Sequence, residues 1–229
     1  MQVLSVEIQS KFSSLEKDFF ASDFQIADKA IEYAAQWNVF CQAGKEILMT
    51  RGYVTTTRDG TSYLVEPMIR YFEKFTSNNG WIADEKDVGW AVLALEAFSH
   101  YTYHRSGGSL IVCDLQGRHL DNTRYRRGGN SKTRFELTDP AICSRHRGYG
   151  PTDLGEKGIE SFFANHVCNR FCHNGGTWAS PRTQRRWFEA SQGTSMLRST
   201  MTHLLDVNNR VTFTIDLDTI DDSDGSGDY

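Results

Sequence analysis

The sequence has no long hydrophobic run. Nowhere in its 229 residues do about 18 apolar residues follow one another, the length that a transmembrane helix needs. The opening residues, MQVLSVEIQSKF, are too few and too often interrupted by charge to form a secretory signal peptide. We therefore expect a cytoplasmic protein without a membrane segment. Because 39% of the residues are hydrophobic, the chain can still bury a substantial core.

Cysteine is also scarce. The chain has five cysteines, an odd number, and without a secretory signal this count argues against a disulfide framework. Three soft ligands are nevertheless crowded together, because His166, Cys168 and Cys172 all fall within the segment FFANHVCNRFCHN. In a reducing compartment such a cluster binds a metal more often than it forms a disulfide. The cluster therefore predicts a metal site, and the competing interpretations are a buried thiol pair or a reactive thiol.

A structural zinc ion takes four ligands in tetrahedral geometry, so one imidazole and two thiolates from this segment leave one position to fill. Spacing alone does not choose the fourth ligand. The candidates are His100, His104, His119, His146, His173 and His203. We favour His100, which ends an apolar helical run where an imidazole needs a polar partner. Of the other thiols, Cys113 is expected to be buried and inert, and Cys143 to be more exposed.

Charge is unevenly distributed along the chain. The net charge is −4, but the last fourteen residues carry six aspartates and no base, so without that stretch residues 1–215 come to +2. Such a tail is typical of a disordered acidic end. Residues 118–147, in contrast, hold eight lysines and arginines. This basic stretch indicates either a loop that meets phosphate or an acidic partner, or a solvated insertion.

Hydrophobic periodicity predicts a mixture of helices and strands. Helices are expected over residues 23–42, 87–100, 152–166 and 195–205. Strands are expected over residues 45–54, 61–69, 109–115 and 210–217. The first helix has Asp23 available as a cap, and its apolar face contains Ile26, Ala30, Tyr33, Ala34, Trp37 and Phe40. Residues 121–135 are polar and basic and are expected to form an inserted loop.

Two short strand-like runs are each followed by an aspartate, in VCDLQG and LTDPAI. Open α/β sites often present their polar groups at such positions. Asp114 and Gln116 are two residues apart, so in a strand their side chains point to the same side. Asp139 precedes a proline, which holds it in extended or turn geometry. These three side chains suit a hard ion such as Mg²⁺, and capping or solvated aspartates are the competing interpretation.

Four blocks occur in order: YLVEPMIRYFEKFTSNNGWI, EAFSHYTYHRSGGSLIVCDLQG, LTDPAI and GYGPTDLGEKGIESFFANHVCNRFC. Together they resemble the atypical alpha-kinase family over roughly residues 20–175. That family includes elongation factor 2 kinase, the myosin heavy chain kinases and the kinase domains fused to melastatin-type channels. The resemblance implies a protein serine/threonine kinase that uses ATP and Mg²⁺ and is stabilised by one Zn²⁺.

The resemblance also implies roles for single residues. The family's structural zinc ligands match His100, His166, Cys168 and Cys172. Asp114 matches the residue proposed to act on the substrate hydroxyl as base or positioner, and Gln116 with Asp139 matches the pair that coordinates Mg²⁺. These roles are consistent with phosphoryl transfer, in which positioning and charge neutralisation dominate.

Further matches concern the nucleotide. Glu66 and Met68 match hinge positions whose backbone meets adenine, and Lys74 and Asn78 match residues that approach the phosphates. Asp153, in PTDLG, matches a loop residue near the phosphate and substrate site and counts among the expected catalytic residues. The implied partners are ATP and a protein substrate.

The sequence departs from the family's pattern in two places. Family members begin with a glycine-rich strand-turn-strand and a strand with a nucleotide-contacting lysine, whereas residues 1–20 contain no glycine. Where that lysine is expected the chain reads Val6-Glu7-Ile8, and Lys11 follows three residues later. Either the sequence is a fragment or shortened gene model, or it is a divergent member that lacks this lysine. Loss of this charge should severely weaken ATP turnover. The basic stretch between Gly117 and Leu137 is the second departure, because the family usually has only a few residues there.

We therefore expect an α+β protein with a two-lobed, protein-kinase-like fold. Residues 1–80 would form a truncated N-terminal lobe with the hinge, residues 81–180 a zinc-stabilised catalytic lobe, and residues 181–229 a C-terminal extension. The leading functional prediction is an alpha-type kinase, and the alternative is a catalytically impaired kinase-like module that binds a nucleotide or a protein partner. A zinc-containing nucleic-acid binder is disfavoured, because the sequence shows no recognition helix or aromatic platform.

Overall fold

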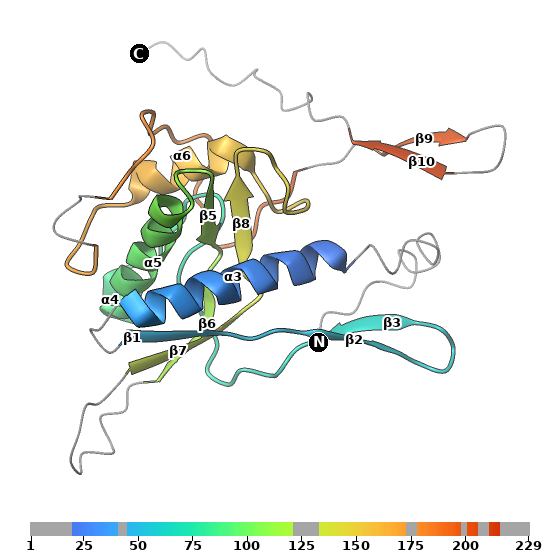
Figure 1. Ribbon diagram of the computed structural model, residues 1–229, viewed down its shortest axis with the longest axis horizontal. Coiled ribbons are helices and arrows are strands. Elements are labelled where there is room, and N and C mark those ends of the chain that lie inside the picture. Colours follow the sequence, from blue (N-terminus) through green and yellow to red (C-terminus); the bar gives the residue numbers. More distant parts are fainter. Residues whose placement is uncertain are drawn as a thin grey trace.

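The computed structural model describes residues 20–40, 45–120, 133–172, 178–197, 201–205 and 211–215 (Figure 1). Only the backbone of the last two ranges is described. The expectations for residues 1–19, for residues 121–132 of the basic loop and for the acidic tail from residue 216 lie outside the described residues.

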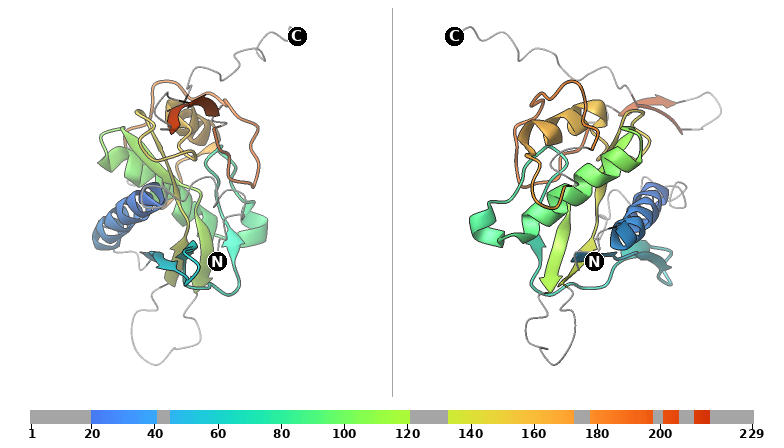
Figure 2. Two further views of the ribbon diagram at one scale, coloured as in Figure 1. Left: turned by 90° about the vertical axis from the view of Figure 1, so that its right-hand side faces the viewer. Right: turned by 60° about the vertical axis from the view of Figure 1, so that its left-hand side comes forward.

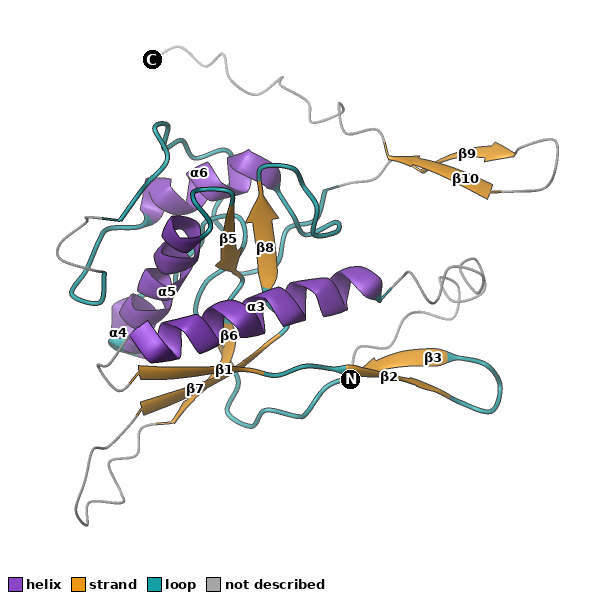
Figure 3. Ribbon diagram, in the orientation of Figure 1, coloured by secondary structure: helices purple, strands orange, loops and turns teal. Residues whose placement is uncertain are grey.

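Groups of strands lie between the helices along the described chain (Figure 3). The helices are α3 (Ala21–Phe40), α4 (Glu85–Val88), α5 (Ala91–Arg105) and α6 (Gly155–Asn165). The strands are β1 (Lys45–Met49), β2 (Tyr53–Thr56), β3 (Ser62–Val65), β4 (Glu73–Lys74), β5 (Leu110–Cys113), β6 (Gln116–Leu120), β7 (Thr133–Thr138), β8 (Ala141–Ser144), β9 (Met201–Leu205) and β10 (Val211–Ile215). This mixed content confirms the predicted α+β class. None of the helices in the described ranges combines the length and the apolar character needed to span a bilayer.

Four strands form the main sheet, in the order β1-β7-β6-β4. β1 runs parallel to β7, whereas β6 is antiparallel to both β7 and β4. Helix α3 packs along β1, and Figures 1 and 2 show it lying across one face of the sheet. The sheet joins distant parts of the chain, because Lys45 in β1 pairs with Thr133 in β7, 88 residues away.

The segments β5–β6 and β7–β8 form one interrupted antiparallel ribbon. β6 pairs with β7 in the main sheet, and β5 pairs with β8 in a separate two-stranded sheet. The strand pairing is interrupted at facing positions of the two segments, at residues 114–115 in one and at residues 139–140 in the other. Asp114 and Asp139 both have positive φ, of 58° and 46°, which turns the backbone out of its extended path. The two predicted acidic residues therefore face each other across a break in the ribbon.

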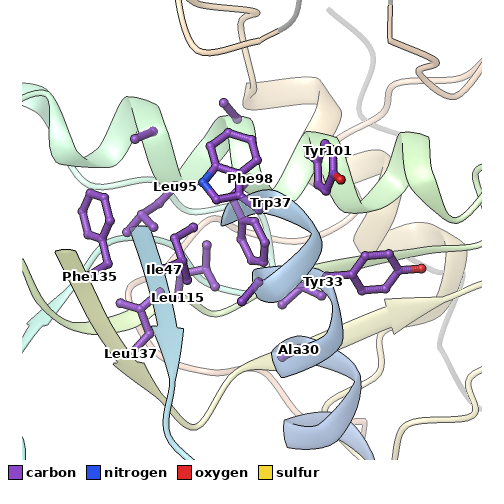
Figure 4. Packing of buried hydrophobic residues seen from close by; sticks show 14 of the residues in the cluster. Ala30, Tyr33, Trp37, Ile47, Leu95, Phe98, Tyr101, Leu115, Phe135 and Leu137 are labelled. Atoms are coloured by element: carbon purple, nitrogen blue, oxygen red, sulfur yellow. The ribbon is translucent and has the colours of Figure 1, made fainter. Parts of the chain in front are cut away.

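The main core lies between α3, α5 and the main sheet, and Figure 4 shows residues from all three meeting there. α3 buries Ile26, Ala30, Tyr33, Ala34 and Trp37, as predicted. The prediction was wrong for Phe40, the last residue of the helix, which is 44% exposed.

Trp37 is at the centre of this core. Its side chain is fully buried, its indole N–H donates to the Lys45 carbonyl oxygen at 3.1 Å, and its ring meets Phe98 edge-on with the centroids 5.8 Å apart. Burial of an aromatic side chain of this size contributes about 3 kcal/mol. The packing of α3 on β1 therefore positions the sheet that carries the site.

Several helix boundaries differ from the predictions. The helix predicted over residues 87–100 is divided, because α4 ends before Gly89, whose φ is 66°, and α5 begins at Ala91 and continues to Arg105. α6 begins three residues later than predicted, at Gly155. Asp23 lies within the first turn of α3 instead of preceding it as a cap.

Three other expectations were wrong. Residues 201–205 of the predicted helix 195–205 form β9, which pairs with β10 inside the predicted strand 210–217. Residues 133–135 belong to β7 and not to the inserted loop, and Phe135 is fully buried there. Cys143 is 0% exposed, because it lies in β8 against β5. For β7 and β8 a strand distant in sequence decides the structure, and local periodicity does not reveal such a partner.

Gly117 allows β6 to approach β7 closely. Its φ is 146°, and a Cβ atom added there would lie 2.1 Å from the Glu136 carbonyl oxygen. Gly117→Ala should therefore lower the free energy of unfolding by about 2 kcal/mol or more. Urea denaturation measures this change. Gly148→Ala is the matched control, because a Cβ atom there meets nothing within 4 Å. Equal stability of the two variants would contradict this account of the sheet.

Candidate active site and metal cluster

The break in the ribbon brings three predicted side chains together. Asp114 follows β5, Gln116 begins β6, and Asp139 follows β7. The Gln116 side-chain amide donates to Asp114 Oδ2 at 3.3 Å and to the Asp139 carbonyl oxygen at 2.9 Å. Asp114 is 1% exposed and Gln116 8% exposed. One buried amide therefore connects the two turns.

Strand β4 brings a cation to the same point. Lys74 lies opposite Gln116 in the β4–β6 ladder. Its Nζ atom lies 2.8 Å from Asp114 Oδ1, and the Lys74 and Asp114 side chains are 12% and 2% exposed. With so little water available, the pair is favourable only if the fold places both groups accurately. The ladder supplies that placement.

Asp139 faces other carboxylates. Burial, together with Glu66, Asp114 and Asp23, raises the pKa of Asp139 to about 6, and Lys74 opposes this rise. Burial and Glu66 raise the pKa of Asp23 to about 6 as well. Asp23, Glu66 and Asp139 line one small pocket between the start of α3, the end of β3 and the turn after β7. A divalent cation at this corner would relieve the repulsion among the three carboxylates.

Of the residues expected to contact the nucleotide, Glu66 lies in this small pocket, and Met68 and Asn78 lie outside its lining. Glu66 lines the small pocket, whereas Met68, two residues further on, is 81% exposed. Asn78 is 1% exposed, and its amide nitrogen donates to the carbonyl oxygens of Thr152 at 2.8 Å and Ser195 at 2.7 Å. Asn78 therefore connects three segments of the chain.

Asp153 organises the loop before α6. It is 0% exposed, and its carboxylate accepts hydrogen bonds from the Ser144 N–H at 2.7 Å and hydroxyl at 2.6 Å. The N–H groups of Tyr149 and Gly155 also donate to it, at 3.2 and 2.9 Å. These bonds position the loop, and a catalytic role for Asp153 stays a prediction.

The four predicted zinc ligands gather at one point. His100 comes from α5, and the other three come from the segment that follows α6. Ligand atoms of His100, His166, Cys168 and Cys172 all lie within 4.8 Å of one another. The Nε2 of His166 is 3.2 Å from the Nδ1 of His100, and the Sγ atoms of Cys168 and Cys172 are 3.6 and 3.7 Å from the nearest of these nitrogens. In a tetrahedral site with Zn–N of about 2.0 Å and Zn–S of about 2.3 Å, neighbouring ligands are separated by about 3.3–3.8 Å.

Both imidazoles are oriented by a partner on their outer nitrogen. His166 Nδ1 lies 3.1 Å from Glu96 Oε1, and His100 Nε2 lies 3.1 Å from the Ala179 carbonyl oxygen. An oxygen acceptor keeps the proton on the outer nitrogen, so the inner nitrogen keeps its lone pair. Both lone pairs are then available at the centre of the cluster, as metal coordination requires.

The protonation states fit the same site. Burial and neighbouring His166 lower the pKa of His100 to about 4, so His100 is neutral at pH 7, as a metal ligand must be. Burial raises the pKa of Cys172 to about 12. A thiolate at Cys172 therefore needs a cation beside it, and Zn²⁺ would supply one. The residues present fit a zinc ion.

Sequence reasoning missed three contributors to these sites. Glu96 had a detectable signal, because it is an acidic residue inside an apolar helical run, one turn before His100. Ala179 and Thr194 had none. They reach His100 and Asp114 across 79 and 80 residues of sequence, and the Thr194 hydroxyl donates to Asp114 Oδ2 at 2.7 Å.

The Alpha-kinase family model matches residues 3–172 of the chain. Among curated proteins, eukaryotic elongation factor 2 kinase of Mus musculus is 33% identical over 132 residues, which cover 57% of this chain and 16% of that protein. The human protein is 26% identical over 195 residues, which cover 83% of this chain and 24% of that protein. The chain thus spans less than a quarter of the length of these two relatives.

Solved structures show the same fold. An alpha kinase from Entamoeba histolytica superposes with a TM-score of 0.54 at 25% identity, over 78% of this chain and 71% of that one. The alpha-kinase domain of myosin heavy chain kinase A in complex with AMPPCP gives a TM-score of 0.51 at 25% identity, over 68% of this chain and 56% of that one. With the family model matching most of its residues, the chain belongs to the alpha-kinase family.

Proposed function

We propose that this chain transfers the γ-phosphate of ATP to serine or threonine hydroxyls of a protein substrate in the cytoplasm. The observation that carries the proposal is the cluster at the break in the ribbon, where Asp114, Gln116 and Lys74 meet beside Asp139. Phosphoryl transfer depends on positioned charges more than on covalent chemistry by the protein, and this cluster provides them. Membership of the alpha-kinase family supports the same activity.

In this proposal each residue of the cluster has a separate task. Asp114 orients the substrate hydroxyl and accepts its proton, while the Lys74 ammonium holds the Asp114 carboxylate in place. Gln116 and Asp139 would hold Mg²⁺, which neutralises charge on the phosphate oxygens when it is bound. Glu66 and Met68 would meet the adenine from residues 1–80, the proposed N-terminal lobe, and residues 81–180 would form the catalytic lobe.

The proposed role of Asp139 predicts a large loss of activity in Asp139→Ala. Purified protein is incubated with labelled ATP, Mg²⁺ and a basic-protein substrate, and incorporation into the substrate is measured. Loss of a charged group that neutralises the transferred phosphate should lower the rate by about 100-fold or more. Asp87→Ala is the control, because Asp87 is an exposed aspartate of α4. Equal labelling by both variants, or no labelling by the unmodified protein, excludes catalysis by this chain.

One observation favours the alternative, a kinase-like module that binds nucleotide without transferring phosphate. Both carboxylate oxygens of Asp114 are already bonded within the chain, Oδ1 to Lys74 and Oδ2 to Thr194. A substrate hydroxyl must therefore displace a group that is already in place. Thermal stabilisation by ATP and Mg²⁺, together with an absence of labelled substrate, would select this function.

The metal cluster supports a second part of the proposal, a structural Zn²⁺ held by His100, His166, Cys168 and Cys172. Four protein ligands fill a tetrahedral site and leave no open position for a reacting molecule. The ion would join α5 to the segment after α6. Its proposed role is therefore to stabilise the catalytic lobe.

The zinc proposal predicts one zinc ion per chain in metal analysis of the purified protein. Removal of zinc with a chelator should lower the melting temperature, because Cys172 and both histidines would remain buried without a metal. Glu96→Gln, which changes only the partner of His166, should weaken zinc affinity by about 10–100-fold. His146→Ala is the control, since His146 is exposed outside the cluster. An unchanged melting temperature in the metal-free protein would show that this account is wrong.

The repulsion among the carboxylates of Asp23, Glu66 and Asp139 predicts that the stability of the protein depends on pH. Because the pKa of Asp23 is raised to about 6 in the folded protein, the folded state holds a proton that the unfolded state has released. The free energy of unfolding should therefore fall as the pH rises from about 4 to about 7. Asp23→Asn should flatten this fall and add about 1 kcal/mol at pH 7.5, a figure reduced for partial exposure of the site.

Urea denaturation at several pH values, without added Mg²⁺, measures the effect of Asp23→Asn. Asp28→Asn is the control on the same helix, because Arg51 lowers the pKa of Asp28 through a hydrogen bond. That variant should not gain stability at pH 7.5. An equal gain in both variants would contradict the assignment of repulsion to Asp23.

A further inference from the structure

The segment of residues 187–197 runs past the Asp114 site and is anchored at both ends. At one end the backbone N–H of Trp187 donates to the Ser161 hydroxyl at 3.0 Å, and its indole N–H donates to Glu160 Oε2 at 2.6 Å. At the other end the Leu197 N–H donates to the Pro151 carbonyl oxygen at 2.9 Å. Phe188 and Leu197 pack against the second hydrophobic cluster. The middle of the segment is thereby held over the site.

Two buried asparagines bind the middle of this segment. Asn78 and Asn79 are 1% and 0% exposed. The Asn78 side chain accepts from the Ser195 N–H at 2.9 Å and donates to its carbonyl oxygen at 2.7 Å. The Asn79 amide nitrogen donates to the Gly193 carbonyl oxygen at 3.2 Å and to the hydroxyls of Ser191 and Ser195 at 2.9 and 3.0 Å. The backbone on both sides of Thr194 is thus held as a bound peptide would be.

The hydroxyl of Thr194 lies where a substrate hydroxyl is expected. Thr194 Oγ1 donates to Asp114 Oδ2 at 2.7 Å and accepts from Lys74 Nζ at 3.0 Å. The hydroxyls of Ser191 and Ser195 are bound by Asn79 instead. Thr194 itself is an exposed residue, so its other side is open to an approaching reactant.

We propose that Thr194 is a phosphorylation site of this chain, modified by the Asp114 site of the same molecule. The inference rests on the proposed kinase function. Thr194 Oγ1 would form a bond to the γ-phosphorus of a nucleoside triphosphate, and the bond from that phosphorus to the bridging oxygen would break. The nucleoside diphosphate leaves with the electron pair, and the hydroxyl proton passes to Asp114 Oδ2. Phosphothreonine and nucleoside diphosphate are the products, with no oxidation or reduction.

The contacts also predict which hydroxyl is modified. Ser191 and Ser195 flank Thr194 in sequence, yet Thr194 alone among these three bonds to Asp114. Modification should therefore concentrate at residue 194. Because the segment is anchored on the same molecule, the reaction should be intramolecular, and its rate per molecule should not depend on protein concentration.

The test incubates the full chain with labelled ATP and Mg²⁺, with a basic-protein substrate in the same tube, and locates the phosphate by mass spectrometry. We expect phosphothreonine at residue 194, with a rate per molecule that stays constant over a 50-fold range of protein concentration. Thr194→Val should lose most of the self-incorporated label, because Thr194 is the hydroxyl that bonds to Asp114. Thr183→Val, which changes another exposed threonine of the 178–197 range, should retain it.

The outcomes separate this inference from the proposed function. Labelled substrate with no phosphate at Thr194 overturns the inference and leaves the kinase function intact. Label at Ser191 or Ser195 in place of Thr194 overturns it as well, and so does a rate per molecule that rises in proportion to protein concentration. No label in either the substrate or the chain overturns both. Mapping on the unmodified protein decides the question even if Thr194→Val does not fold.

Discussion

The ion pair between Lys74 and Asp114 is the interaction on which the candidate site depends. Both side chains are largely buried. Their attraction therefore offsets the loss of hydration only while the two charged groups are held at the right distance. The β4–β6 ladder fixes Lys74 opposite Gln116, and the positive φ of Asp114 takes the backbone out of the ribbon at the same level. The geometry of the site therefore depends on the backbone pairing of the main sheet.

The metal cluster acts on this arrangement through two helices. α5 packs on β5, which runs directly into Asp114, and α6 packs on β8, which follows the turn that contains Asp139. His100 lies on α5, and His166 follows the last residue of α6. An ion held by both histidines would fix the two helices relative to each other, and through their strands the two turns of the site. In the proposed function, zinc thus influences catalysis by position, without touching a reacting atom.

The sequence predicted the features that depend on neighbouring residues. The apolar stripe around Trp37 and the grouping of His166 with two cysteines were both visible as local spacings, and the structure contains both. The parallel pairing of β1 with β7 was not predictable, because periodicity shows which side of a strand is buried but not which distant strand covers it. The contact between Thr194 and Asp114 was not predictable for the same reason. A threonine in a polar segment has no local feature that indicates an aspartate 80 residues away.

The contact of Thr194 with Asp114 also changes how a protein substrate could be selected. An outside hydroxyl would exchange one hydrogen bond to Asp114 for an equivalent one, so this exchange contributes little net free energy. Selection must then come from the groups around the hydroxyl, where Asn78 and Asn79 hold the backbone beside Thr194. Both asparagines are buried, and loss of the bonds that this segment makes to the Asn78 carbonyl oxygen and the Asn79 amide nitrogen would be unfavourable. In the proposed function, a segment that enters the site would therefore offer a hydroxyl to Asp114 and backbone groups to both asparagines at once.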